Sequence, residues 1–131
     1  MSEAASENRG KLLASISDEL VRLHKEFHGR GPDKARTYYT DDVIVCLMGG
    51  GFERVEQSLL ESGRGGAVVN QRREFQDMMQ ERFRAAVERL TGRKVLAVMA
   101  DSHQDPDLLL EVFVLESALT ALRPQHAPVE K

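Results

Sequence analysis

Carboxylate and imidazole side chains alternate with other residues in one stretch near the end of the sequence. They are Asp101, His103, Asp105 and Asp107. Groups this close together are competent ligands for a divalent metal ion, and a bound metal would support a metal-dependent enzyme. The spacing resembles the opening of an EF-hand loop, but Pro106 and Val112 stand where that loop needs Gly and Glu. The competing interpretation is an ordinary turn, because Asp-Pro-Asp is a common turn sequence.

Two short basic segments point to a different chemistry. Residues 29–36 read Gly-Arg-Gly-Pro-Asp-Lys-Ala-Arg, and Arg64 lies among glycines just before a long predicted helix. The free N–H groups at a helix start attract anions. Neither segment is a P-loop, since no Gly-Lys-Ser/Thr follows. We predict a small-anion or nucleotide site from Arg30, Lys34, Arg36, Thr37 and Arg64. The alternative is that the glycines serve only helix ends and sharp turns.

Histidine and cysteine offer fewer options. His24 and His28 lie four residues apart, a spacing that can chelate a metal, but Lys25 stands where a zincin motif requires Glu. We therefore interpret the pair as a boundary histidine and a capping histidine near a helix end. The single cysteine, Cys46, lies in an apolar run and is expected to be a small buried hydrophobe. No nucleophile–base arrangement stands out, so we predict no catalytic residues and no cofactor.

Helices and hairpins must position these side chains. Apolar residues spaced by threes and fours predict a helix over 6–28, and the same periodicity predicts a long helix that follows 64–66 and ends near Thr91. A short helix is predicted over 53–62. Strands are predicted at 36–39 and 43–48, joined by the turn 40–42, and at 94–100 and 109–115, joined by the loop 101–107.

This order predicts an α+β fold, a two-layer αββαββ sandwich. Its four-stranded antiparallel or mixed sheet would carry the two long helices on one face, as in a circularly permuted ferredoxin-like fold. The second strand of each hairpin is expected to be central and the first to be an edge. We predict one domain over 1–122 with its core at 12–116, and a flexible tail over 123–131.

Composition limits the partners. The chain has 18 basic and 21 acidic residues, which argues against a domain held by nucleic-acid phosphates. No run approaches the roughly 20 apolar residues of a membrane span, and the first ten residues are unlike a signal peptide. We therefore expect a cytoplasmic protein without membrane insertion. The long helix exceeds the depth of a small sheet, and its charged residues look solvated or subunit-facing, so we expect a homodimer. Those residues are Arg72, Arg73, Asp77, Glu81, Arg84, Glu88 and Arg89.

Several stretches together resemble the MpsC-like (YbcI-like) domain family over about residues 16–116. The most specific are Leu-His-Lys-Glu-Phe-His-Gly-Arg-Gly-Pro at 23–32, residues 34–38, Arg-Arg-Glu-Phe-Gln at 72–76, Leu-Thr-Gly-Arg-Lys-Val at 90–95, residues 101–107, and residues 111–116. The chain departs from the family pattern where Leu-Thr-Pro usually opens the short helix. Phe52, Glu53 and Arg54 stand there instead, which removes the usual Thr cap and Pro start.

The resemblance implies an accessory protein rather than a defined activity. Family members look like soluble partners of a sodium-linked or inorganic-carbon membrane system, and the family provides no catalytic residues to carry over. We therefore expect a non-enzymatic accessory or regulatory protein that acts through protein–protein contacts, with a partner in a membrane transport system. The anion sensor and the metal-dependent enzyme are the alternatives.

Overall fold

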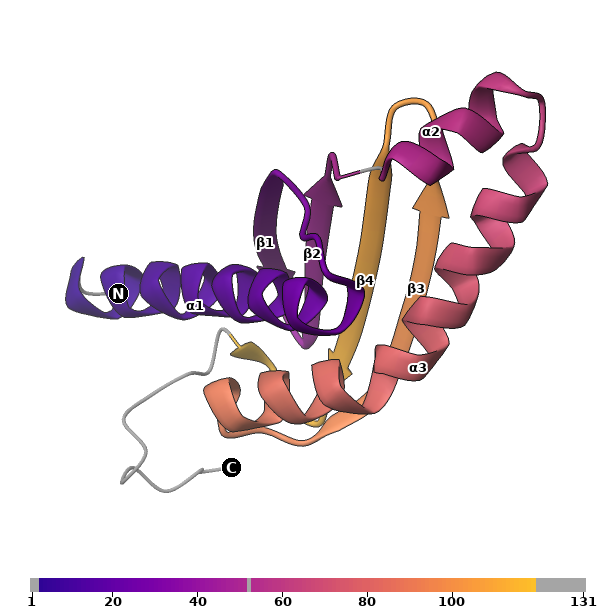
Figure 1. Ribbon diagram of the computed structural model, residues 1–131. Coiled ribbons are helices and arrows are strands. Elements are labelled where there is room, and N and C mark those ends of the chain that lie inside the picture. Colours follow the sequence, from indigo (N-terminus) through magenta and orange to yellow (C-terminus); the bar gives the residue numbers. More distant parts are fainter. Residues whose placement is uncertain (1–2, 52, 120–131) are drawn as a thin grey trace.

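A computed structural model describes residues 3–51 and 53–119 of the chain (Figure 1). The helices are α1 (Glu3–His28), α2 (Arg54–Glu61) and α3 (Gly65–Thr91). The strands are β1 (Lys34–Thr40), β2 (Val43–Gly49), β3 (Val95–His103) and β4 (Leu108–Leu115). The predicted order of helix, hairpin, helix, hairpin is confirmed, with the short α2 preceding α3. The predicted tail over 123–131 lies outside the described residues.

The four strands form one sheet in the order β1-β2-β4-β3, and each neighbouring pair is antiparallel. The second strand of each hairpin is central, as predicted, because β2 and β4 pair with each other along their whole length, from Val43 opposite Val114 to Gly49 opposite Leu108. On β3 the register shifts between Val95 and Ala97, which marks a bulge near the start of this edge strand.

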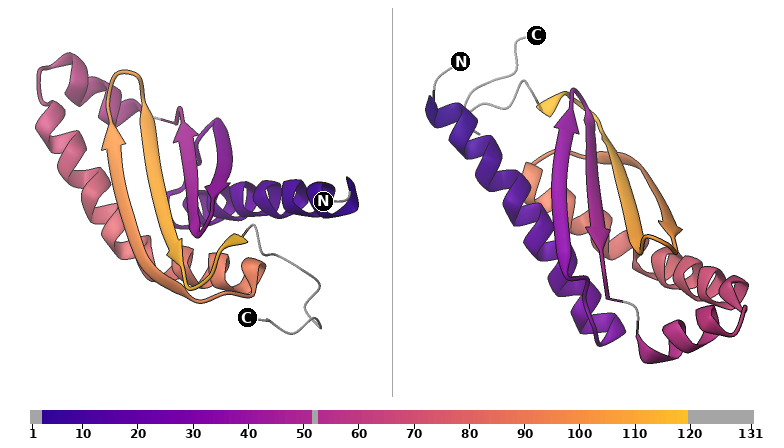
Figure 2. Two further views of the ribbon diagram at one scale, coloured as in Figure 1. Left: turned by 180° about the vertical axis from the view of Figure 1, so that it is seen from behind. Right: turned by 90° about the horizontal axis from the view of Figure 1, so that it is seen from above.

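Both long helices cover the same face of the sheet (Figures 1 and 2). Every second residue of β2 and β4 points toward them, and the side chains of Ile44, Cys46 and Phe113 are fully buried there. Side chains from the helices complete the core: Ile16, Leu20, Leu23, Met79, Phe83 and Val87. The two-layer α+β architecture predicted from the periodicities is therefore confirmed.

The opposite face of the sheet, which we call the open face, has no described helix against it (Figure 2, left). The strand register places apolar residues of β2 and β4 in its middle: Val43, Val45, Leu47, Leu110, Val112 and Val114. Edge residues continue the same rows, so that Tyr38, Val45, Val112 and Met99 form one row across the four strands. Tyr38 is 51% exposed and Met99 is 56% exposed. This face therefore presents an apolar band to the outside.

Two details differ from the sequence-based expectation. The second hairpin is longer than predicted, since β3 continues through Asp101 and His103, which pair with Leu110 and Leu108 of β4. The turn that remains is only Gln104 to Asp107. The interpretation of the charged residues of α3 as one outer surface was wrong for Arg72, which is 7% exposed and faces the interior. Arg84 also turns inward, because its guanidinium donates to the backbone carbonyl of Val95.

Candidate functional site: a buried polar cluster at one end of the sheet

A group of polar side chains is buried where the end of α1, the start of α2, the first half of α3 and the β3–β4 turn meet. Gly29, with φ +90°, ends α1 beside His28, and its N–H donates to the carbonyl of Lys25 at 2.9 Å. The N–H of Gly50 donates to the carbonyl of Asp107 at 3.2 Å, which holds the loop after β2 against the turn. Segments far apart in the sequence are thereby brought together.

Arg72 of α3 is the centre of this cluster. Its Nε lies 3.4 Å from Oε2 of Glu56, and its Nη1 lies 2.7 Å from Oδ1 of Asp107. The side chains of Arg72 and Glu56 are only 7% and 2% exposed. A guanidinium that contacts two carboxylates compensates charges that would otherwise be costly to bury. Arg72 therefore links α2 and the β3–β4 turn to α3.

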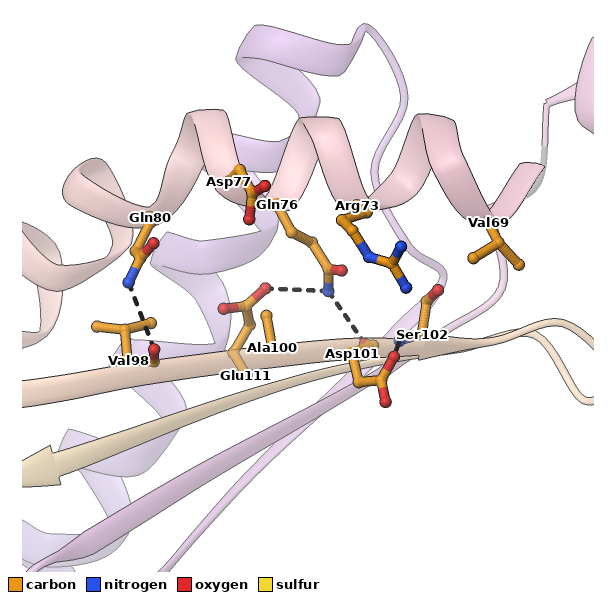
Figure 3. Close-up of a pocket in the computed structure, with 10 residues that line it drawn as sticks. All are labelled: Val69, Arg73, Gln76, Asp77, Gln80, Val98, Ala100, Asp101, Ser102 and Glu111. Atoms are coloured by element: carbon orange, nitrogen blue, oxygen red, sulfur yellow. Dashed lines mark hydrogen bonds between the residues drawn. The ribbon is translucent and has the colours of Figure 1, made fainter. Parts of the chain in front are cut away.

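Gln76, one turn further along α3, connects the helix to both strands of the second hairpin. Its Nε2 donates to Oε2 of Glu111 at 3.3 Å and to the backbone carbonyl of Asp101 at 3.0 Å (Figure 3). Glu111 points from β4 toward α3 and is 1% exposed. Burial raises the pKa of Glu111 to about 8, and the hydrogen bond from Gln76 offsets part of that rise. Glu111 is therefore mostly protonated at neutral pH.

Gln76 and Glu111 also line a small cavity of about 100 Å³ between α3 and β3. Arg73, Asp77 and Gln80 of α3 border it on the helix side (Figure 3). The side chain of Asp101 points away from α3, toward the open face. The cavity is therefore lined by the protonated carboxyl group of Glu111, by amide groups, and by the charged side chains of Arg73 and Asp77.

Two histidines of α1 pack against Phe75 of α3. The ring centroids of His24 and His28 lie 4.7 and 4.9 Å from that of Phe75. His24 is 7% exposed, and burial lowers its pKa to about 4, so the ring is neutral at pH 7. Its Nδ1 lies 3.2 Å from the carbonyl of Arg30, which only an N–H can satisfy, so the free lone pair is on Nε2.

His28 has a different environment, beside two carboxylates of α2. Its Nε2 lies 3.5 Å from Oε2 of Glu53, the residue before the helix. One ligand atom from each of His28, Glu53 and Glu56 can be chosen so that all three lie within 4.8 Å of one another. In the part of the chain that the structure describes, this is the one group of three or more metal-ligating side chains so close together. Sequence reasoning missed Glu53 and Glu56, although their i,i+3 spacing at a helix start was a visible signal.

The residues predicted to bind an anion are only partly brought together. Lys34 and Arg36 line one groove of about 400 Å³, which Asp33 and Asp107 also border. Thr37 points to the helix side of β1, where its hydroxyl lies 2.6 Å from that of Ser17. The remaining two, Arg30 and Arg64, are exposed and do not line that groove.

The residues predicted to hold a metal in the second hairpin point to different surroundings. Asp107 contacts Arg72, whereas Oδ1 of Asp101 accepts the N–H of Ser102 at 2.8 Å. Nδ1 of His103 lies 2.9 Å from the carbonyl of Pro106, and Asp105 is exposed. A metal ion in this hairpin stays a prediction.

Comparison with known proteins decides the family. The family model described as "Na+-translocating membrane potential-generating system (MpsC)" matches residues 8–117. The chain belongs to the MpsC family. It is 24% identical over 108 residues to YrhF of Bacillus subtilis (strain 168), which is described as an uncharacterized protein. The matched region is 81% of this chain and 88% of YrhF. No solved structure matches the chain.

The segments that resemble the MpsC family contribute most of the polar cluster, and Glu53 and Glu56 come from outside them. Residues 23–32 contribute His24 and His28, residues 72–76 contribute Arg72, Phe75 and Gln76, and the two stretches of the second hairpin contribute Asp107 and Glu111. In the described part of the MpsC chain, no helix is both long enough and apolar enough to cross a membrane.

Proposed function

We propose that this MpsC protein is a non-enzymatic, cytoplasmic accessory protein of a membrane ion-transport or inorganic-carbon-transport system, and that it works as a homodimer joined through the open face. The observation that carries the proposal is the apolar band on that face. Val45 and Val112 lie opposite each other in its middle, and Tyr38 and Met99 extend the same row to both edges. An apolar sheet face bordered by polar residues is typical of an interaction surface.

The charged residues at the two borders of the band indicate which partner binds the open face. Arg36 on β1 and Asp101 on β3 lie in one row, with Leu47 and Leu110 between them. A two-fold axis parallel to the strands exchanges the two edges of the sheet and keeps each row in place. Arg36 would then face Asp101 of the partner subunit, twice in a symmetric dimer. Such an aligned packing of two sheets is a common arrangement, so a second copy of the chain fits this surface.

The dimer is tested by measuring the mass in solution over a range of protein concentrations. Val112→Arg should produce a monomer, because it places a charge in the apolar middle of the open face. Val55→Arg is the matched control, since Val55 lies on α2 and is 64% exposed. Arg36→Asp and Asp101→Arg should each weaken the dimer, and the double charge swap should restore it. A wild-type chain that stays monomeric at high concentration would refute this part of the proposal.

The link to a membrane system is supported by the printed description of the family, which names Na+ translocation and membrane potential. It is tested in cells that lack the protein, by measuring membrane potential with a voltage-sensitive dye at several external Na+ concentrations. We expect a lower potential, restored by the wild-type chain and not by Val112→Arg. An unchanged potential at every Na+ concentration would contradict the link.

A second candidate function is a sensor for a small anion such as bicarbonate or a nucleotide, favoured by the groove that brings Lys34 and Arg36 together. Asp33 borders the same groove and would oppose an anion there. Thermal-shift measurements with bicarbonate, phosphate and ATP test it, because a ligand at a hundredfold its Kd adds about 2.7 kcal/mol of stability. No shift with any of the three anions would argue against the sensor.

A further inference from the structure

We propose that His28, Glu53 and Glu56 form a binding site for a divalent transition-metal ion. The site joins the end of α1 to the start of α2. His28 is too far from Glu53 and Glu56 in the sequence for a short motif to contain all three. It is independent of the proposed dimer, because none of its residues lies on the open face. It also differs from the hairpin site that the sequence predicts around His103.

The distances are close to those that a metal requires. Bonds of about 2.1 Å to a tetrahedral ion separate two ligand atoms by roughly 3.4 Å. Nε2 of His28 and Oε2 of Glu53 are already 3.5 Å apart. The widest separation in the group is at most 4.8 Å, so the site closes with a movement of no more than about 1.4 Å. The side chains of His28 and Glu53, which are 14% and 35% exposed, can supply this movement toward Glu56.

All three ligands have contacts that orient them, and in the capping box of α2 the side chain of Glu53 accepts the backbone N–H of Glu56. Oε1 of Glu56 accepts the backbone N–H of Glu53 at 3.2 Å, and its Oε2 contacts Arg72. The ring of His28 is 14% exposed and packs edge-on against Phe75. Ligands oriented by a second layer of hydrogen bonds and packing are characteristic of metal sites. Three oriented side chains, of which that of Glu53 is the most exposed, can thus converge on an ion.

The charges around the site favour a dication. Glu53, Glu56 and Asp107 carry three formal negative charges, and Arg72 compensates one of them. An ion with two positive charges would balance the remaining two negative charges. Arg72 limits the affinity, since it contacts Oε2 of Glu56. Oε1 accepts the backbone N–H of Glu53 and has a second lone pair that can bind a metal ion.

The donor set indicates the kind of metal. One imidazole nitrogen with two carboxylate oxygens suits Zn²⁺, Mn²⁺ or Fe²⁺ better than Ca²⁺ or Mg²⁺, which prefer oxygen alone. Three protein ligands would leave at least one coordination position for water or a partner's side chain. Zn²⁺ and Mn²⁺ are therefore the appropriate probes.

The test uses the untagged full-length chain after removal of metals with a chelator. Isothermal titration with Zn²⁺ and with Mn²⁺ should show one ion per chain for at least one metal. Glu53→Thr should weaken binding at least tenfold, and His28→Gln should do the same. Glu53→Thr is informative because Thr is a preferred N-cap residue, so α2 keeps its start while the ligand is lost. Circular dichroism and a melting curve verify that each variant is folded.

His103→Gln is the matched control, because it removes the other imidazole that the sequence predicts as a ligand. Binding that persists in His103→Gln and is lost in folded Glu53→Thr would support the site. Three outcomes would overturn it: no binding of either metal by the wild-type chain, unchanged binding in Glu53→Thr, or binding that only His103→Gln removes. The third outcome would place the metal in the second hairpin instead.

Discussion

Replacing the carboxyl group of Glu111 with an amide should change how stability depends on pH. Burial raises the pKa of Glu111 from 4.5 to about 8 in the folded chain. Between these values the folded chain binds more protons than the unfolded chain. The free energy of unfolding therefore falls as the pH rises, by about 1.4 kcal/mol per pH unit. The stability that protonated Glu111 contributes is complete below pH 4.5 and is lost as the pH rises through 8.

His24 has the opposite effect over a lower range. Burial lowers its pKa from 6.5 to about 4, so the folded chain binds fewer protons than the unfolded chain between these values. This contribution is complete above pH 6.5 and is lost as the pH falls through 4. Considering these two groups alone, the slopes cancel between pH 4.5 and pH 6.5. The wild-type chain should then lose about 2 kcal/mol between pH 6.5 and pH 8.

The variant Glu111→Gln removes one of the two slopes and keeps the shape of the side chain. Its amide oxygen can still accept the hydrogen bond from Gln76. Urea unfolding followed by circular dichroism, at intervals of half a pH unit from 5 to 8.5, measures the difference from wild type. As the pH rises, the free energy of unfolding of the variant should increase relative to that of the wild-type chain by about 1.4 kcal/mol per pH unit. Between pH 5 and pH 8 this amounts to about 4 kcal/mol.

Glu74→Gln makes the same chemical change at an exposed position of α3 and serves as the control. Its profile should run parallel to that of the wild-type chain. If Glu111→Gln also runs parallel to wild type from pH 5 to pH 8.5, the raised pKa of Glu111 is refuted.

Two further predictions concern buried groups. Arg72→Met should cost about 3–5 kcal/mol of unfolding free energy, because it leaves the buried Glu56 and the partly buried Asp107 without their cation. The same change at exposed Arg73 should cost no more than about 0.5 kcal/mol. If urea unfolding shows equal losses for Arg72→Met and Arg73→Met, the cluster does not stabilise the fold. The thiol of Cys46 should not react with a disulfide reagent at pH 8 until urea unfolds the chain, because the side chain is fully buried and burial raises its pKa to about 11. Stoichiometric labelling of the folded protein would contradict that burial.

The fold follows from short-range patterns that the sequence displays openly. The spacing of Ile16, Leu20 and Leu23 marks the buried side of α1, and all three are in the core. Glycine marks the end of α3, where Gly92 takes φ +68°. Periodicity and helix-stop signals depend on residues that are close in sequence, so they can be recognised without knowledge of the tertiary structure.

The candidate site was much harder to predict, because its contacts connect distant positions. Arg72 is 16 residues from Glu56 and 35 residues from Asp107. On α3 its charge was indistinguishable from those of exposed neighbours such as Arg73. Glu111 interrupts an apolar strand by one residue only, and alternation alone cannot tell whether such a carboxylate is buried. The register with Cys46 and Ala100 decides this.

The metal-ligating residues show the same limit in another form. The His24–His28 spacing drew attention to a pair on one helix, whereas the structure places His28 beside Glu53 and Glu56 of α2. The departure of residues 52–54 from the family pattern was visible in the sequence. Its consequence, a carboxylate next to an imidazole, required the packing of α1 against the start of α2.

The bulge at the start of β3 affects how the protein can associate with copies of itself. A free sheet edge can recruit a strand from another chain and build an indefinitely growing sheet. Here one edge is distorted by the shift between Val95 and Ala97, and the other edge carries the charges of Lys34 and Arg36. Both features disfavour strand addition. Self-association through the open face, and not through the sheet edges, favours a closed dimer over a fibre. The monomer can therefore expose the apolar band with a reduced risk of aggregation.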